Sequence, residues 1–237
     1  MRYFCINYMV CQMDNAATHP LWNDDYWLPV MQLFMRRPAG VKAMYAPATV
    51  ELALSLHVPP EHIYGRMFAL RRHDTPVTAA LWRTYAGNPR RLRRDAATLR
   101  RMEGFGSSGA FYDGVTVAET WERDFRPVAG GERFYGDRPL MPVTLIMVLD
   151  MYFRLTPVTM TAITPEVRDM ARLTAMNVDG ILILLACFRH TDPYLNHPCP
   201  PLPPAVVDAC RDVWRRYGND DPQRLAALAA QMRDFFR

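Results

Sequence analysis

The sequence has almost no lysine. Lys42 is the only one, against 27 arginines. This imbalance indicates a compositional bias of the genome, so an arginine by itself is weak evidence for a binding site. The formal net charge is only +4 over 237 residues, which is too small to imply a polyanionic partner.

Long apolar runs are also missing. The apolar stretches 140–153 and 178–188 contain Asp150 and Asp179, and both are shorter than the ~20 residues that a membrane span needs. The N-terminus has no sustained apolar core and no small-residue cleavage site, so it does not resemble a signal peptide. The five cysteines form no Cys-x-x-Cys pair, which favours free thiols over a disulfide framework. We therefore expect a cytoplasmic protein without a membrane partner.

Familiar catalytic motifs are absent from the sequence. It contains no P-loop, no His-Glu-x-x-His, no nucleophile elbow and no Ser-His-Asp set. "GFGSSG", residues 104–109, matches the spacing of a dinucleotide-binding loop. A predicted helix precedes it where that fold requires a strand, which excludes the Rossmann interpretation.

One cluster of metal-ligand residue types occurs, in "RHTDPYLNHPC". His190, Asp192, His197 and Cys199 lie within ten residues, but their spacing fits no common zinc site. The prediction is a proline-rich loop in which Asp192 turns the chain. The sequence thus predicts no catalytic, cofactor-binding or metal-binding residue and no cofactor. An enzyme at this loop is the least favoured of three hypotheses for function.

Proline marks the starts of predicted helices. Several prolines follow a capping residue, as in Thr75-Pro76 and Asn88-Pro89, and proline at the first helical position lacks an N–H that would be unpaired there. Gly87, Gly104 and Gly218 are predicted to end helices in the left-handed conformation. These signals and the helical periodicity predict an all-α fold with helices near 2–14, 25–37, 47–57, 60–73, 76–86, 89–103, 142–155, 165–175, 178–190, 204–217 and 222–236.

Residues 104–141 interrupt the helical pattern. They hold seven of the twelve glycines and are predicted to be a linker or insertion. "GVTVAETW", residues 114–121, and "RFYG", residues 133–136, are expected to form a short β-hairpin within it.

The two sides of this segment resemble each other. "LWRTYAGNPRRL", residues 81–92, is echoed by "VWRRYGNDDPQRL", residues 213–225. Matched positions continue at a shift of 118 near residue 47, 132 near residue 82 and 133 near residue 89, and these shifts rise in chain order. We therefore predict two copies of one unit of five helices, with an N-terminal unit at 1–103 and a C-terminal unit at 142–237. Trp82 and Trp214 then occupy equivalent core positions.

Charge is distributed unequally between the two halves. Residues 1–103 carry 14 Arg and Lys against 8 Asp and Glu, whereas residues 104–237 carry 14 against 16. The excess lies in "PRRLRRDAATLRRM", residues 89–102, whose helical periodicity places Leu92, Ala96, Leu99 and Met102 opposite an arginine face. We define the arginine face as Arg90, Arg93, Arg94, Arg100 and Arg101. Two interpretations are open, an ordinary solvated face and a binding patch for phosphates or acidic groups.

The segment "TVELALSLHVPPEHIYGRMFALRR", residues 49–72, resembles a helix-turn-helix. The resemblance spans about twenty residues of a hairpin over 47–73, and His57 stands where that family usually has glycine. It implies DNA or RNA binding, with Arg66, Arg71 and Arg72 joining the arginine face as candidate anion-binding residues. The equivalent helix of the second copy, "VDGILILLACF", is apolar on every side, which is typical of a buried helix and not of one that reads a groove.

These observations lead to three hypotheses for function. The first is a non-enzymatic binding protein with an unknown protein partner. The second is a nucleic-acid-binding regulator that uses the hairpin and the arginine face. The third is the enzyme already mentioned.

Overall fold

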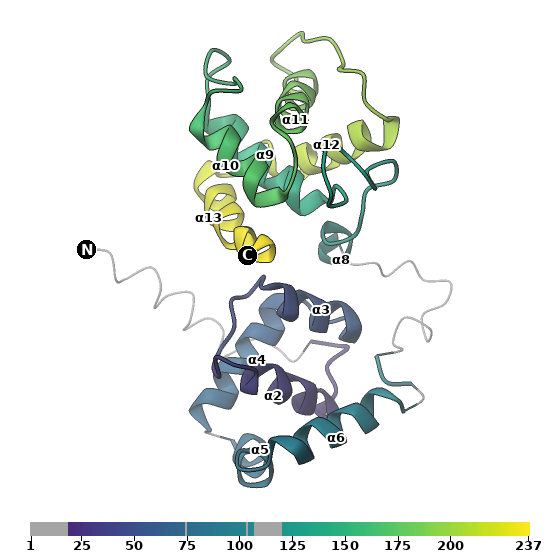
Figure 1. Ribbon diagram of the computed structural model, residues 1–237, viewed down its shortest axis with the longest axis vertical. Coiled ribbons are helices and arrows are strands. Elements are labelled where there is room, and N and C mark those ends of the chain that lie inside the picture. Colours follow the sequence, from purple (N-terminus) through teal and green to yellow (C-terminus); the bar gives the residue numbers. More distant parts are fainter. Residues whose placement is uncertain (1–18, 74, 103, 107–119) are drawn as a thin grey trace, which may run out of the picture. The chain divides into compact units, whose positions relative to one another are not determined.

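The computed structural model describes residues 19–73, 75–102, 104–106 and 120–237 (Figure 1). These residues form α-helices and short 3-10 helices, and among them the only β-type pairing is an isolated bridge between Gly136 and Met176. The predicted all-α fold is confirmed. The contacts divide the chain into two compact units, Met1–Val117 and Ala118–Arg237. The helix expected near 2–14 lies outside the described residues.

The N-terminal unit is built around its first long helix. α2 packs against the second, third and fifth helices of the unit, whereas the fourth, α5, packs mainly against the fifth, α6. Proline occupies the first turn of α3 to α6, and side chains of Thr75 and Asn88 cap α5 and α6. The elements are η2 (Asp24–Tyr26), α2 (Trp27–Met35), α3 (Pro47–Leu56), α4 (Pro60–Arg72), α5 (Pro76–Tyr85) and α6 (Pro89–Arg100).

The C-terminal unit is built around α9 in the same way. α9 packs against all four of the helices that follow it, and an unbroken run of its side chains, from Val143 to Tyr152, is buried. The elements are α8 (Thr120–Asp124), α9 (Pro142–Arg154), α10 (Pro165–Thr174), α11 (Val178–Thr191), α12 (Pro204–Tyr217), α13 (Pro222–Met232) and η3 (Arg233–Phe236).

Residues 120–141 are part of the C-terminal unit, whereas the sequence predicts a linker there. Phe125, Phe134 and Leu140 are buried, since the segment supplies apolar side chains to the core of this unit. Its backbone folds on itself, because the Val128 N–H donates to the Leu140 carbonyl at 2.8 Å. The second half of the expected hairpin, 133–136, is not a strand. Most of the first half lies outside the described residues.

None of the three predicted glycine caps ends its helix in the left-handed conformation. α6 already ends at Arg101 in the right-handed conformation, three residues before Gly104. Gly104 has a positive φ of 88°, but Gly218 is right-handed, with φ of −66°, and α5 ends at Ala86 in the right-handed conformation. Left-handed caps instead occur at His57, φ 54°, His73, φ 56°, and Ala175, φ 55°. A residue with a side chain enters this region at a cost that the surrounding turn must offset.

The turn after the second helix has the same geometry in the two units. The Val58 N–H donates to the Ala53 carbonyl at 3.1 Å, and the Met176 N–H donates to the Ala171 carbonyl at 3.0 Å. Each bond spans the left-handed residue, as in a Schellman-type cap. Two hairpins of matching length, α3–α4 and α10–α11, follow from it.

The fourth helix of each unit carries a tryptophan that contacts a phenylalanine of the first helix. The ring centroids of Trp82 and Phe34 are 5.8 Å apart, and those of Trp214 and Phe153 are 5.6 Å apart. Trp214 is buried with 7% exposure, whereas Trp82 is only half-buried. The same aromatic pair therefore lies at different depths in the two units.

Candidate functional site

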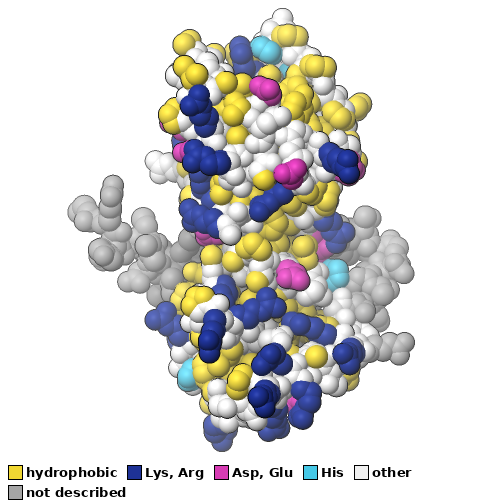
Figure 2. Space-filling view, in the orientation of Figure 1, with side chains coloured by type: hydrophobic (Ala, Val, Ile, Leu, Met, Phe, Trp, Pro, Cys, Tyr) yellow, Lys and Arg dark blue, Asp and Glu magenta, His cyan; other side chains and the backbone are white. Residues whose placement is uncertain are grey.

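α6 is an amphipathic helix with one buried and one cationic side. Leu92 and Ala96 are buried at 2% and 0% exposure, and the helix packs against α2. Every member of the arginine face is exposed. Figure 2 shows Lys and Arg side chains gathered over the part of the N-terminal unit where α5 and α6 lie in Figure 1.

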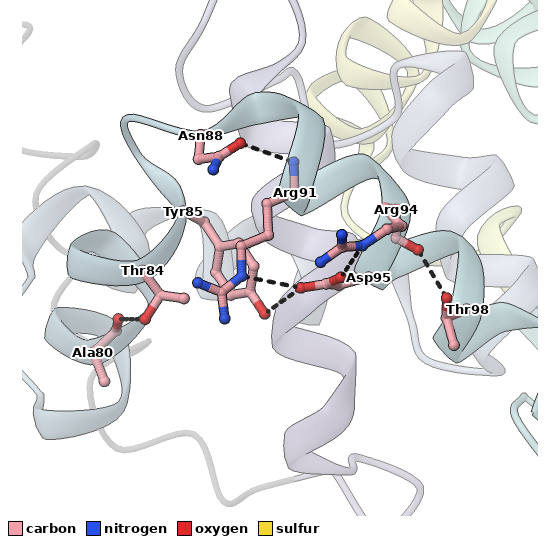
Figure 3. A network of polar contacts seen from close by, with 8 residues as sticks. All are labelled: Ala80, Thr84, Tyr85, Asn88, Arg91, Arg94, Asp95 and Thr98. Carbon is pink, nitrogen blue, oxygen red and sulfur yellow. Dashed lines mark hydrogen bonds and ion pairs between the residues drawn. The ribbon is translucent and has the colours of Figure 1, made fainter.

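The carboxylate of Asp95 on α6 forms ion pairs with two arginines of the same helix, Arg91 and Arg94 (Figure 3). The Asp95 carboxylate lies 3.0 Å from Arg94 Nε and 3.4 Å from Arg91 Nε. It also accepts a hydrogen bond from the Tyr85 hydroxyl at 3.3 Å. The hydrogen bond from Arg94 is the main cause of the lowered pKa of Asp95. Arg94 is thereby partly neutralised.

The other four members of the arginine face have no acidic partner in the described part of the chain. They are Arg90, Arg93, Arg100 and Arg101. Arg90 lies in the first turn of α6, where the positive end of the helix dipole disfavours a cation. This turn contains no acidic residue that could offset the charge. Arg90 and Arg93, three residues apart on one helix, also repel each other. The electrostatics of α6 therefore favour an external anion.

Arg66 lies in a different environment from the arginine face. Its guanidinium lies 4.5 Å from the centroid of the Trp22 ring and 5.2 Å from that of Trp27, and its Nε donates to His62 Nε2 at 3.1 Å. Burial lowers the pKa of Arg66. Burial, followed by the charge of Arg66, lowers the pKa of His62 to about 4. Arg66 is thus held by aromatic rings in the interior of a cluster.

This cluster affects the helix-turn-helix interpretation. In that motif the second helix, here α4, must present polar side chains to the bases. The ring of Trp22 packs on His62 with centroids 5.2 Å apart, and His19 lies on the same side at 5.9 Å. The first turns of α4 are therefore covered by the segment that precedes α2. Only Arg71 and Arg72, in the last turn of α4, are fully exposed candidates on this helix.

The arginines of α12 show the opposite arrangement. Arg211 pairs with Asp208 at 2.8 Å, and Arg215 pairs with Asp212. Arg216 makes two hydrogen bonds to Asp124, at 2.9 and 2.8 Å. This last pair joins α8 to α12, and its side chains are only 19% and 7% exposed. The cations of this helix are satisfied within the C-terminal unit.

The loop after α11 uses its metal-ligand residue types in internal contacts. His190 Nδ1 lies 2.8 Å from the His197 carbonyl oxygen, and Asp192 accepts a hydrogen bond from the Tyr152 hydroxyl at 2.7 Å. Cys199 Sγ lies 3.5 Å from the Pro200 carbonyl oxygen. In the described ranges, no three His, Cys, Asp or Glu side chains come together in a metal-binding arrangement.

The arginine face follows from the sequence, but the ion pair with Asp95 that sets Arg94 apart from the other four arginines was not predicted. The spacing of Arg91 and Asp95, four residues apart, was a readable signal for an ion pair. The stacking of Arg66 on two tryptophans had no such signal, because it depends on the approach of a distant segment to α4.

Comparisons with known proteins give no relative. No family model, no curated protein and no solved structure matches the chain. Within the described ranges, no helix combines the length and apolar character needed to cross a membrane.

Proposed function

We propose that the chain is a non-enzymatic binding protein made of two copies of one five-helix unit. In this proposal the N-terminal copy binds an acidic protein segment through the arginine face of α6. Among the residues that the structure describes, the C-terminal copy has no equivalent cationic face, because the arginines of α12 are paired with carboxylates.

Three correspondences support the duplication. The five main helices occur in the same order in each unit, from α2 to α6 and from α9 to α13. The left-handed residues His57 and Ala175 are 118 positions apart, which is the shift that aligns the surrounding sequences. The tryptophan of each fourth helix contacts the phenylalanine of each first helix.

One observation carries the binding function, namely four exposed arginines, three on α6 and Arg101 directly after it, that lack an acidic partner among the described residues. Surface cations are commonly paired with nearby carboxylates, and α12 pairs all three of its arginines. α6 has only Asp95, which already contacts Arg91 and Arg94. An acidic partner would relieve the repulsion along α6 and form charge-assisted hydrogen bonds with the guanidinium groups.

A nucleic acid is the second candidate, because phosphates also suit arginine and because α3 and α4 form the expected hairpin. Trp22 packs over the start of α4, and this packing favours a protein partner over a nucleic acid. The groove-reading helix would have to lose that cover before it could approach bases.

The experiment measures fluorescence anisotropy of a labelled poly-glutamate peptide at physiological salt. Arg93→Gln combined with Arg101→Gln should weaken binding by about tenfold, which corresponds to about 1.4 kcal/mol over two contacts. The matched control is Arg211→Gln combined with Arg215→Gln, which removes the same charge from α12. It should leave the affinity within about twofold of wild type, since these arginines are already paired.

Two results would contradict the proposal. Equal weakening by both double variants would mean that only net charge matters. A labelled DNA duplex that binds much more tightly than the peptide, with a steep dependence on salt, would replace the acidic protein by a nucleic acid.

A further inference from the structure

The N-terminal unit contains a hollow beside Trp82 that lies apart from the arginine face. Its volume is about 600 Å³, within the range of small-molecule pockets. It opens between the end of α2, the following loop, the last turn of α4 and α5. Its lining residues are Phe34, Met35, Ala39, Gly40, Val41, Arg71 and Trp82.

The aromatic wall of the hollow is held in place before any ligand arrives. The indole N–H of Trp82 donates to the Leu70 carbonyl at 2.6 Å. The ring of His73 lies on the indole with centroids 4.3 Å apart, and Phe34 meets it edge to face at 5.8 Å. A fixed indole offers a flat apolar surface at little cost in conformational entropy.

The charged group of the hollow is a single guanidinium. Arg71 is exposed at the end of α4 and has no acidic partner among the residues that the structure describes. Lys42, next to the lining residue Val41, does not line the hollow, and its ammonium group donates to the carbonyls of Arg36 and Pro38. The remaining lining side chains are apolar. The hollow thus combines one cation with aromatic and aliphatic walls.

We propose that this hollow binds a small apolar carboxylate with an aromatic ring. The ring would lie against Trp82 and Phe34, where offset or edge-to-face packing is favourable. The carboxylate would accept hydrogen bonds from Arg71, whose planar fork matches its two oxygens. The proposal rests on none of the α6 arginines and is independent of the proposed protein partner.

The C-terminal unit supplies an internal reference. Trp214 is buried, and its ring contacts both Tyr152, at 5.8 Å, and Phe153. α12 also packs against α9 and α11. A ligand that enters the hollow should therefore perturb Trp82 and leave Trp214 unchanged.

The experiment titrates the intact protein with 2-naphthoate and records the indole N–H signals of the five tryptophans by two-dimensional NMR. Trp82→Phe and Trp214→Phe variants assign the two signals. Saturable movement of the Trp82 signal alone is expected. Arg71→Gln should weaken binding about fivefold, the upper range for an exposed ion pair, and should abolish the preference over neutral 2-naphthylmethanol. Val41→Phe should fill the hollow and prevent binding, while an unchanged signal of Trp27, which is buried in the same unit and does not line the hollow, shows that this variant is folded.

The matched control for charge is Arg93→Gln, which should weaken peptide binding to α6 but leave naphthoate binding unchanged. Failure of the peptide experiment alone would remove the proposed function and keep this site. The site is overturned if the Trp82 signal does not move up to about 5 mM 2-naphthoate, beyond the weak end of ligand affinities. It is also overturned if Val41→Phe binds as wild type does. If Arg71→Gln keeps wild-type affinity and preference, carboxylate recognition is wrong.

Discussion

The fourth helix of each unit carries a tryptophan, and the two tryptophans differ in burial. α12 packs against α9 and α11, and its Trp214 is buried under Tyr152 and Phe153. α5 packs mainly against α6, and its Trp82 remains half-buried beside a hollow. One aromatic contact, that between tryptophan and the phenylalanine of the first helix, is common to both. The same contact between tryptophan and phenylalanine thus occurs both where the fourth helix packs closely on its neighbours, as α12 does, and where it leaves the tryptophan half-exposed, as α5 does.

The two units also differ in how far their arginines are paired with carboxylates. The C-terminal unit pairs the arginines of α12 with carboxylates on α12 and α8. The N-terminal unit leaves most of the arginine face without such partners among the described residues. The more open unit is therefore also the unit with unsatisfied charge, which is why both proposed binding sites lie there.

The largest predicted effect tests the difference in packing. Trp214→Ala should lower the free energy of unfolding by about 3–5 kcal/mol, because it empties a closed core. Trp82→Ala should cost about 1–2 kcal/mol, because less of that ring is removed from water. Chemical denaturation followed by circular dichroism measures both. Equal losses would mean that the two tryptophans are buried alike.

The next effect tests the difference in ion pairing. Asp124→Asn should lower the free energy of unfolding by about 2–3 kcal/mol, because it leaves the largely buried Arg216 with only Asp212 nearby. Asp208→Asn, which removes an exposed partner of Arg211, is the control and should cost less than about 0.5 kcal/mol. Losses of the same size in the two variants would show that the Arg216 pair is as hydrated as a surface pair.

A smaller effect tests the aromatic cluster of the N-terminal unit. The pKa of His62 is lowered from 6.5 to about 4, so the folded state binds the proton less well than the unfolded state. The resulting stability is present above pH 6.5 and is lost as the pH falls from 6.5 toward 4. Because His62 is partly exposed, we expect a loss of about 2 kcal/mol at most after solvent screening.

The control for this effect is His62→Gln, which cannot titrate. Unfolding of wild type and variant is compared at pH 7 and pH 4.5, so that the difference isolates this histidine from the others. The position 118 residues later is Gly180, so the C-terminal unit should add no equivalent term. A wild-type pH dependence that survives unchanged in His62→Gln would refute the assignment.

The smallest predicted effect concerns metal. No zinc should copurify with the protein, and a chelator should leave the midpoint of thermal unfolding unchanged, because the His190–Cys199 loop satisfies its polar groups internally. Elemental analysis gives the first result. Near one zinc per chain, lost in His197→Ala, would overturn this prediction.

The helices could be predicted from sequence because their signals are local. Proline after a capping residue, as at Asn88-Pro89, marked the starts of helices that the structure contains. The apolar periodicity of residues 89–102 correctly placed Leu92 and Ala96 in the core, but its prediction for Met102 is wrong, because α6 ends at Arg100 and Met102 is 60% exposed. The position of the arginine face followed directly from that periodicity.

What could not be predicted depends on contacts between distant segments. Residues 120–141 read as a linker because their glycines suggest freedom, yet Phe125 and Leu140 are buried in the C-terminal unit. The sequence predicts Arg66 as a surface cation, but its guanidinium contacts the rings of Trp22, before α2, and Trp27, the first residue of α2. The ends of α3 and α10 were predicted to within one residue, but the left-handed caps at His57 and Ala175 were not, because glycine usually occupies that conformation.

The central claim is that two copies of one unit share the contact between the fourth and first helices. Nuclear Overhauser effects from the indole rings of Trp82 and Trp214 test it most directly, with the signals assigned through the Trp→Phe variants. The duplication predicts effects from Trp82 to the ring of Phe34 and from Trp214 to the ring of Phe153, since the centroids lie 5.8 and 5.6 Å apart. A tryptophan whose strongest effects reach a different helix of its unit, with none to the first, would contradict the claim.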